Sequence, residues 1–229
     1  QTCALPIYFG RGYSERPKTS YNKDLYVDSL KELMDSQDIA QPVHLVGYSM
    51  GGPIVGHFAV SYPDLSKSLT LIAPAGFLIE ASGLTGWTTK PLFGDWFWHV
   101  FNHRIYGVGR MSETVGSDDP LSINEEEFLA NFNNQLLYKG FTESLLSTVR
   151  NFNLFNAKEM YSRVGSMKIP TLAIWGKLDG VVPYDGSLLL KKSIPQVTLE
   201  TIDEGTHDIT YRQPTQVGEA MKTFLLTIE

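Results

Sequence analysis

One segment of this 229-residue sequence constrains the fold more than any other. The apolar run at residues 43–46 is followed at once by GYSMGGP at 47–53, and then by an apolar stretch that reaches about residue 61. A short apolar run bounded by turn residues is typical of a buried β-strand. Pro53 fits the first turn of a helix, where its missing N–H is no loss. The segment therefore predicts a strand, a sharp turn and a helix in direct succession.

Three more apolar runs predict further strands, at residues 69–73, 171–175 and 197–202. Helical segments separate the strands, and this alternation gives a parallel sheet with right-handed crossovers. The runs are continuous rather than alternating, so we expect both faces of the sheet to be covered. An amphipathic pattern at 21–37, with Asn22 or Ser20 as its N-cap, predicts one more helix. The fold class that follows is α/β.

The long interval between the second and third strands is expected to form a helical cap. Residues 77–161 contain 15 of the 27 aromatic residues and no comparable β run. A connection of this length inside a compact domain is usually an elaborated, functional segment. Helical patterns at 124–138 and 142–154 support this interpretation. We therefore predict a core formed by residues 8–76 and 162–229, with the cap inserted between two of its strands.

The turn at 47–51 has the Gly-x-Ser-x-Gly pattern of a nucleophile elbow. In such a turn Ser49 stands between a strand and a helix, where the helix N-terminus favours negative charge. We expect glycine at 47 and 51 because a side chain there would collide with the neighbouring strand or helix. The N–H of Met50 would point at the oxyanion of a tetrahedral intermediate. The pattern predicts Ser49 as a nucleophile, with Gly47 and Gly51 shaping its turn.

A serine hydroxyl needs a base, and five histidines are available. His207 follows the last predicted strand and so lies at the carboxyl edge of the sheet, where open α/β sheets place their sites. Of the others, His44 and His57 fit packing or surface roles, whereas His99 and His103 belong to the predicted cap and could line a pocket or be solvated. A metal site formed by the last two lacks an acidic third ligand at a suitable spacing. His207 is therefore the predicted base.

The base in turn needs a carboxylate that fixes its tautomer and stabilises its charged form. Asp179 lies in the turn after the third predicted strand, again at the carboxyl edge of the sheet. Asp185 lies a few residues downstream and is the fallback. Asp203 lies within or just after the last strand, and Asp208 would point away from the ring of His207. Asp179 is the predicted acid.

The order of serine, aspartate and histidine resembles that of the α/β-hydrolase family. The resemblance runs from residue 8 to the C-terminus and rests on FGRGYSERP at 9–17, LVGYSMGG at 45–52, LTLIAPAG at 69–76, IPTLAIWGKLDGVVP at 169–183 and EGTHDI at 204–209. Within the family the chain is most similar to small capped esterases, including monoacylglycerol-lipase-like members, and to C–C bond hydrolases of ring-cleavage products. Serine at position 49 argues against the dehalogenase and epoxide-hydrolase branches.

The N-terminal part departs from the family pattern. Family members have three or four strands before FGRGYS, and a loop there supplies a second oxyanion N–H. Residues 1–7, QTCALPI, match the translation of a sequencing-adapter end, so we expect them to be an artefact and the natural sequence to begin near Tyr8. The edge of the strand at 43–46 would then lack a partner, which favours aggregation. We expect the 229-residue chain by itself to be inactive or poorly folded.

A second, milder departure is Asp208-Ile209 after His207, where the family often has a small residue or proline.

Composition limits the partners. The formal net charge of −6 offers nucleic acid no electrostatic footprint. Cys3 is the single cysteine, so no disulfide framework or thiolate metal site is expected. No apolar run approaches the ~18 residues of a membrane-spanning helix. We expect a cytoplasmic protein by default, although an export signal upstream of residue 8 would not be visible in this sequence. The sequence does not indicate an oligomeric state.

These features predict a serine hydrolase that needs no cofactor and no metal. Its substrate would be a small molecule, a carboxylic ester with an apolar acyl or alcohol part, because aromatic cap residues suit apolar ligands. Two alternatives stay open: a C–C bond hydrolase and a non-catalytic binding protein on the same fold. A C–C bond hydrolase would need a cation for the substrate carboxylate, and the sequence does not distinguish among the candidates Arg104, Arg110, Arg150 and Arg163.

Overall fold

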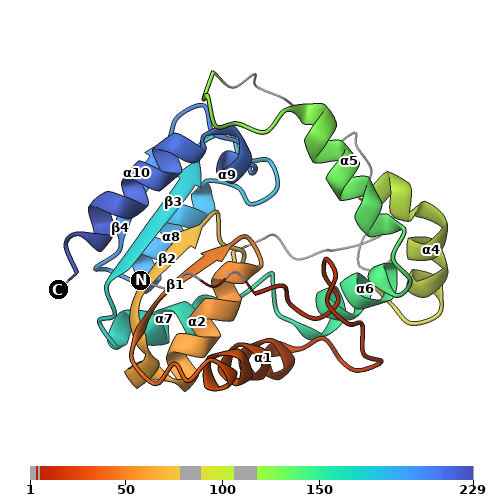
Figure 1. Cartoon of the computed structure of the whole chain (residues 1–229), viewed down its shortest axis with the longest axis horizontal. Helices are drawn as coiled ribbons and strands as arrows, with labels where there is room; N and C mark the ends of the chain where they lie inside the picture. The colour runs from red at the N-terminus through yellow and green to blue at the C-terminus, as the bar shows by residue number, and fades with distance from the viewer. Residues whose placement is uncertain (1–3, 5, 78–88, 106–117, 229) are drawn as a thin grey trace. The chain divides into compact units, whose positions relative to one another are not determined.

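A computed structural model describes residue 4 and residues 6–77, 89–105 and 118–228 (Figure 1). Contacts divide the chain into two units. Unit 1 consists of Gln1–Ile39, Ala81–Thr114 and Asn124–Asn153, and unit 2 of Ala40–Glu80, Val115–Ile123 and Leu154–Glu229. The sheet lies in unit 2. Residues 1–39 group with the helices of the inserted segment, and the predicted division into core and cap stays a prediction.

The sheet of unit 2 has four parallel strands in the order β1-β2-β3-β4. They are β1 (Val43–Tyr48), β2 (Ser66–Ile72), β3 (Thr171–Gly176) and β4 (Thr198–Ile202). The α/β class and all four predicted strands are thereby confirmed, each within a few residues of its expected bounds. All six residues of β3 are buried, as expected for a strand that is covered on both faces. Among the described residues, β1 and β4 form the two edges of the sheet.

Helices cover the sheet of unit 2 on both faces (Figure 1). The helices α2 (Gly51–Ser61), α7 (Lys158–Ser166) and α8 (Asp185–Ser193) pack side by side, with the short 3-10 helix η1 (Pro63–Leu65) after α2. The helices α9 (Ile209–Arg212) and α10 (Pro214–Leu225) follow β4, and α10 packs on β3. The core under α10 is mainly aliphatic, with Ile72, Ile174, Ile202 and Val217, and it also includes the aromatic Phe224. The predicted helix after Ser49 is α2, and Pro53 does lie in its first turn.

A short segment of the inserted region belongs to unit 2 and is tied to its last helices. The carboxylate of Asp119 accepts hydrogen bonds from both the N–H and the hydroxyl of Thr215, each at 2.8 Å. Four residues later, the N–H of Ile123 donates to the carbonyl oxygen of Tyr211 at 3.1 Å. Asp119 lies at the start of the described part of this segment, and no sequence pattern predicted its contact with α10.

Unit 1 contains α1 (Lys23–Ser36), α4 (Phe93–Ile105), α5 (Glu125–Leu136) and α6 (Phe141–Asn151). The helix predicted at 21–37 is α1, and Asn22 is its N-cap, since its side chain accepts a hydrogen bond from the N–H of Leu25. The patterns at 124–138 and 142–154 correspond to α5 and α6, whereas α4 was not predicted. Residues 78–88 and 106–117 of the predicted cap, including Trp87 and Arg110, lie outside the described residues.

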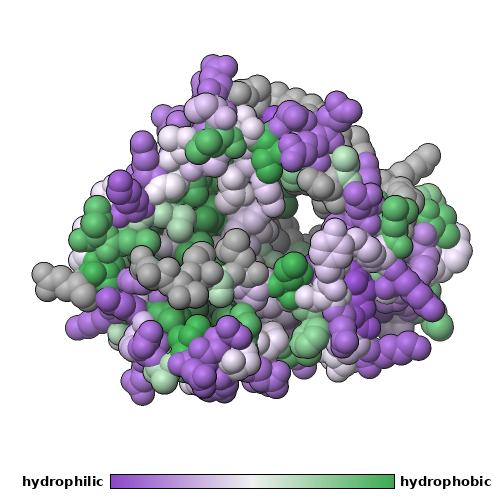
Figure 2. Space-filling model, viewed as in Figure 1, coloured by the Kyte–Doolittle hydropathy of each residue, from purple (hydrophilic) through white to green (hydrophobic). Residues whose placement is uncertain are grey.

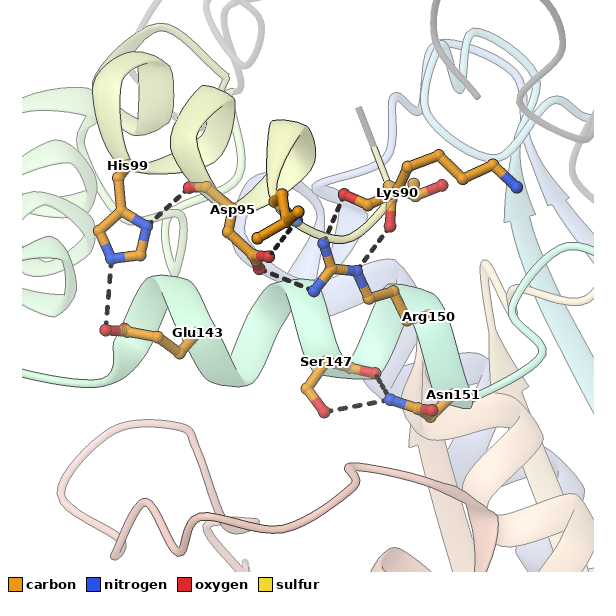
Figure 3. Close-up of polar contacts among 9 residues, drawn as sticks. Lys90, Asp95, His99, Glu143, Ser147, Arg150 and Asn151 are labelled. Atoms are coloured by element: carbon orange, nitrogen blue, oxygen red, sulfur yellow. Dashed lines mark hydrogen bonds and ion pairs between the residues drawn. The ribbon is translucent and has the colours of Figure 1, made fainter. Parts of the chain in front are cut away.

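Arg150 on α6 joins α4 and the chain before it (Figure 3). Its guanidinium donates to the carbonyl oxygens of Thr89 at 2.6 Å and Lys90 at 2.9 Å, and to the carboxylate of Asp95 at 2.7 Å. The hydrogen bond from Arg150 holds the pKa of Asp95 below its ordinary value. A second link is more exposed: the imidazole of His99 bonds the carbonyl oxygen of Asp95 at 2.8 Å and the carboxylate of Glu143 at 3.3 Å.

No helix in the described part of the chain has the length and apolar character needed to cross a membrane. Figure 2 shows hydrophilic residues over most of the visible surface, interrupted by separate apolar areas.

Candidate active site

The turn between β1 and α2 holds Ser49 in an uncommon backbone conformation. Its φ is 51°, in the left-handed region that side-chain-bearing residues rarely adopt. The neighbouring strand stabilises this conformation: the N–H of Ser49 donates to the carbonyl oxygen of Ile72 at 2.9 Å. The carbonyl oxygen of Ser49 accepts from the N–H groups of Ala75 and Gly52, both at 3.0 Å. Such strain costs about 1–3 kcal/mol and clusters at functional sites, where the surrounding structure maintains it.

The two glycines of the elbow pattern have different surroundings. A Cβ on Gly47 would lie against the backbone of Gly51 and 2.8 Å from the nitrogen of Gly52, so no side chain fits there. A Cβ on Gly51 would meet no described atom within 4 Å. The prediction that a side chain at residue 51 would collide with its neighbours is therefore wrong. The second crowded position is Gly52, where a Cβ would lie 3.0 Å from the Cα of Pro74 and 3.2 Å from the hydroxyl of Tyr161.

The structure brings together the three side chains predicted to carry the chemistry, all of them in unit 2. The Nε2 atom of His207 lies 3.0 Å from Oγ of Ser49. The Nδ1 atom of the same ring lies 2.8 Å from Oδ2 of Asp179. The side chains of Asp179 and His207 are 0% and 11% exposed. A hydroxyl, an imidazole and a carboxylate thus form one hydrogen-bonded row.

The turn that carries Asp179 is braced on both sides of the carboxylate. Its Oδ1 atom accepts from the N–H groups of Val181 at 2.9 Å and Val182 at 2.7 Å, which leaves Oδ2 for His207. The buried Trp175 at the end of β3 donates its indole N–H to the carbonyl oxygen of Val182 at 2.9 Å. The carboxylate of Asp179 is therefore held in place by its own turn.

Close packing of two glycines brings together the turns that carry Asp179 and His207. A Cβ on Gly176 would collide with the backbone of Gly205 and lie 2.7 Å from the carbonyl oxygen of Thr206. The N–H of Leu178 also donates to the carbonyl oxygen of Gly205 at 2.8 Å. Gly176 is the last residue of β3, and Gly205 follows shortly after the end of β4 at Ile202, so this contact joins the carboxyl ends of two neighbouring strands. No sequence pattern predicted the contact.

Two of the three alternative acids have other partners. Asp203 pairs with Lys177 at 2.5 Å on the surface. Asp208 pairs with Arg212 at 3.1 Å and accepts from the hydroxyl of Thr206. Asp185 is the first residue of α8.

The other four histidines lie on β1, α2 and α4. His44 bonds the hydroxyl of Ser68 at 2.7 Å, and its burial lowers its pKa. His57 lies on α2 of unit 2, whereas His99 and His103 lie on α4 of unit 1. Among the arginines considered for a carboxylate group, Arg104 lies on α4, Arg150 is engaged with Asp95, and Arg163 lies on α7.

Met50 directly precedes the first residue of α2, so its N–H belongs to the N-terminal end of that helix. The partial positive charge of a helix N-terminus favours an anion at this point. Its role as an oxyanion donor stays a prediction. In the described part of the chain, no group of three or more His, Cys, Asp or Glu side chains is arranged to hold a metal ion.

Comparison with known proteins identifies the family. A family model for the alpha/beta hydrolase fold matches residues 1–212, and the chain belongs to this family. "Lipase 3" of Moraxella sp. (strain TA144) is 28% identical over 211 residues, which cover 89% of this chain and 62% of that protein. Human "Monoacylglycerol lipase ABHD6" is 26% identical over 193 residues, covering 82% of this chain and 56% of that protein. The chain spans about three fifths of the length of these curated relatives.

Solved structures share the fold of this chain. The meta-cleavage product hydrolase (CumD) of Pseudomonas fluorescens IP01 superposes with a TM-score of 0.69 and 22% identity, over 97% of this chain and 78% of that one. A bromoperoxidase from Bacillus anthracis gives a TM-score of 0.73 and 24% identity, over 95% and 79%. At such identities the likeness establishes the fold alone.

Proposed function

We propose that the protein is a serine hydrolase that cleaves a carboxylic ester through an acyl-enzyme. The observation that carries this proposal is the hydrogen-bonded row from Ser49 through His207 to Asp179, at 3.0 Å and 2.8 Å. These distances lie in the range that a nucleophile, its base and an orienting acid require. The family assignment and the relatives named as lipases are consistent with ester cleavage.

The reaction divides into two acyl transfers. Oγ of Ser49 attacks the ester carbonyl while its proton passes to Nε2 of His207, and Asp179 stabilises the resulting imidazolium. The N–H of Met50 stabilises the oxyanion. The C–O bond to the alcohol then breaks, and the alcohol takes the proton from His207. Water attacks the acyl-enzyme by the same route, giving its proton to His207, and the carboxylic acid leaves as Ser49 recovers that proton.

An apolar substrate is the second part of the proposal. The relatives are named as a lipase and a monoacylglycerol lipase, and both names refer to lipid substrates. The aromatic-rich inserted segment suits apolar groups, because small-molecule sites are lined mainly by hydrophobic and aromatic side chains. We therefore expect the preferred ester to carry an apolar acyl or alcohol part.

A fluorophosphonate probe and a series of p-nitrophenyl esters test the proposal on the protein expressed from its whole reading frame. We expect covalent labelling and ester turnover, both lost in Ser49→Ala. The matched control is Ser166→Ala, since Ser166 is an exposed serine on α7 whose hydroxyl only bonds its own helix. Labelling that persists in Ser49→Ala, or no labelling of the folded protein, would contradict the mechanism. Turnover of a dienone acid without ester turnover would favour the C–C bond hydrolase. The 229-residue chain, assayed in parallel, tests whether it is inactive by itself.

A further inference from the structure

Tyr48 occupies the variable position of the elbow pattern, directly before Ser49, and its side chain contacts the predicted base. It is the last residue of β1. Its hydroxyl donates a hydrogen bond to the backbone carbonyl oxygen of His207 at 2.9 Å. Its ring also lies against the imidazole, with ring centroids 5.3 Å apart and planes inclined by 31°. One residue thus contacts both the backbone and the ring of His207 from the strand that carries the nucleophile.

The surroundings of Tyr48 fix its ring and keep its hydroxyl a donor. The ring of Tyr211 packs against it edge-on, with centroids 6.3 Å apart. Burial strongly raises the pKa of Tyr48, and the nearby phenol and carboxylates act in the same direction. The phenol therefore keeps its proton throughout the working range of an ester hydrolase. A partly buried hydroxyl gains from a partner, since leaving it without one would carry a desolvation penalty.

Several contacts tie the turn that carries His207 to its neighbours. The N–H of Leu178 donates to the carbonyl oxygen of Gly205 at 2.8 Å, and the imidazole bonds the carboxylate of Asp179. The N–H of Gly205 bonds the carbonyl oxygen of Ile202 at 3.1 Å before the turn. Asp208 pairs with Arg212 after it. Between these points, the bond from Tyr48 joins the turn directly to β1. Because Ser49 follows Tyr48 in the chain, this bond sets the backbone of the base relative to the backbone of the nucleophile.

We propose that Tyr48 is a positioning residue, which holds the His207 backbone so that its Nε2 atom meets Oγ of Ser49. The inference rests on the proposed serine hydrolase function. It gives the variable position of the elbow pattern a defined role, which the pattern itself does not contain. The hydrogen bond and ring contacts described for the Tyr48 side chain are made with His207 and Tyr211, so we infer that it acts through His207.

Tyr48→Phe removes the hydroxyl and keeps the ring. We expect kcat and the fluorophosphonate labelling rate to fall about fivefold, the scale of one neutral hydrogen bond, with KM within a factor of two. The matched control is Tyr184→Phe, which removes another tyrosine hydroxyl of unit 2, bonded to Thr201 at 2.7 Å. We expect the control to label at the wild-type rate. Equal labelling rates for Tyr48→Phe and wild type would overturn the proposal.

A double-mutant cycle separates positioning from a general structural effect. In a His207→Ala background, Tyr48→Phe should cause no further fall in the residual rate, because it acts only through the missing imidazole. A further fivefold fall in that background would show that Tyr48 acts on the fold, and would overturn the proposal.

A readout without substrate keeps the inference distinct from the proposed function. The proton between Nδ1 of His207 and Asp179 should give a low-field NMR signal in wild type that broadens in Tyr48→Phe and persists in Tyr184→Phe. Wild-type labelling with an unchanged signal in Tyr48→Phe would overturn the positioning role alone. A wild-type protein with neither labelling nor turnover would overturn the proposed function, and the role of Tyr48 in catalysis with it.

Discussion

Alanine at the two glycines of the elbow pattern should have opposite outcomes. In Gly47→Ala the new Cβ meets the backbone of Gly51 and lies 2.8 Å from the nitrogen of Gly52. These are backbone atoms at a strand–helix junction, so they cannot rotate away as a side chain could. Overpacking in a well-packed interior costs about 1–3 kcal/mol, and we place this substitution at about 3 kcal/mol because its obstacles are rigid. That is a large part of the ~5–15 kcal/mol stability of a typical domain.

Gly51→Ala is the matched control. Its Cβ meets no described atom within 4 Å, and alanine is favoured over glycine in a helix by up to about 1 kcal/mol. We expect its stability to equal or exceed that of wild type.

Urea unfolding measures the difference between the two variants. With an m-value of about 2–3 kcal/mol/M, Gly47→Ala should lower the midpoint by about 1–1.5 M. Gly51→Ala should leave the midpoint unchanged or raise it, and should retain fluorophosphonate labelling. Equal losses in both variants, or a wild-type midpoint for Gly47→Ala, would refute the packing argument.

Three further predictions concern charged groups. Asp179→Asn should lower kcat by about 10⁴-fold with little change in the unfolding midpoint, because the imidazole loses the carboxylate that orients it; a loss of less than tenfold in ester turnover would contradict this role. Arg150→Gln should destabilise unit 1 by about 1 kcal/mol, because the ion pair with Asp95 is partly exposed, and hydrogen exchange in α4 should rise. The pKa of His99 is raised by its bond to the carbonyl oxygen of Asp95 and by Glu143. The protonated ring therefore stabilises the folded state fully below the unfolded pKa near 6.5, and this stabilisation is lost as the pH rises through the raised pKa. His99→Gln should therefore unfold more easily than wild type at pH 5.5 and equally at pH 9, and the same difference at both values would exclude the charge effect.

The order of elements in unit 2 could be predicted because hydrophobic periodicity and turn residues act locally. The four strands, the helix after Ser49 and the N-cap at Asn22 each depend on residues a few positions apart. The pairing of Asp179 with His207 could also be predicted. Both follow strands of one parallel sheet, so topology alone places them at the same edge.

The missed features depend on contacts between distant parts of the chain. Helix α4 is an exception, because its apolar residues at 93, 96, 97, 100 and 101 follow the spacing of an amphipathic helix and the pattern was overlooked. Its link to Arg150, in contrast, joins residues more than fifty positions apart. Open space beside Gly51 was not predictable, because the pattern does not show how neighbouring elements diverge. The bond from Tyr48 spans 159 positions and ends on a backbone carbonyl, which every residue possesses. No pattern in the sequence marks such an acceptor.

The braced turn beneath the acid also equips unit 2 with a spectroscopic reporter. Of the four tryptophans, Trp175 is the one that belongs to unit 2, and it is fully buried and bonded to the carbonyl of Val182. In unit 1, Trp96 is 56% exposed. Indole emission shifts to longer wavelength on contact with water, so the blue component of the fluorescence should come largely from buried indoles such as Trp175. With the other tryptophans replaced by phenylalanine, the emission of Trp175 would report the opening of the turn that holds Asp179, because its indole is bonded to that turn.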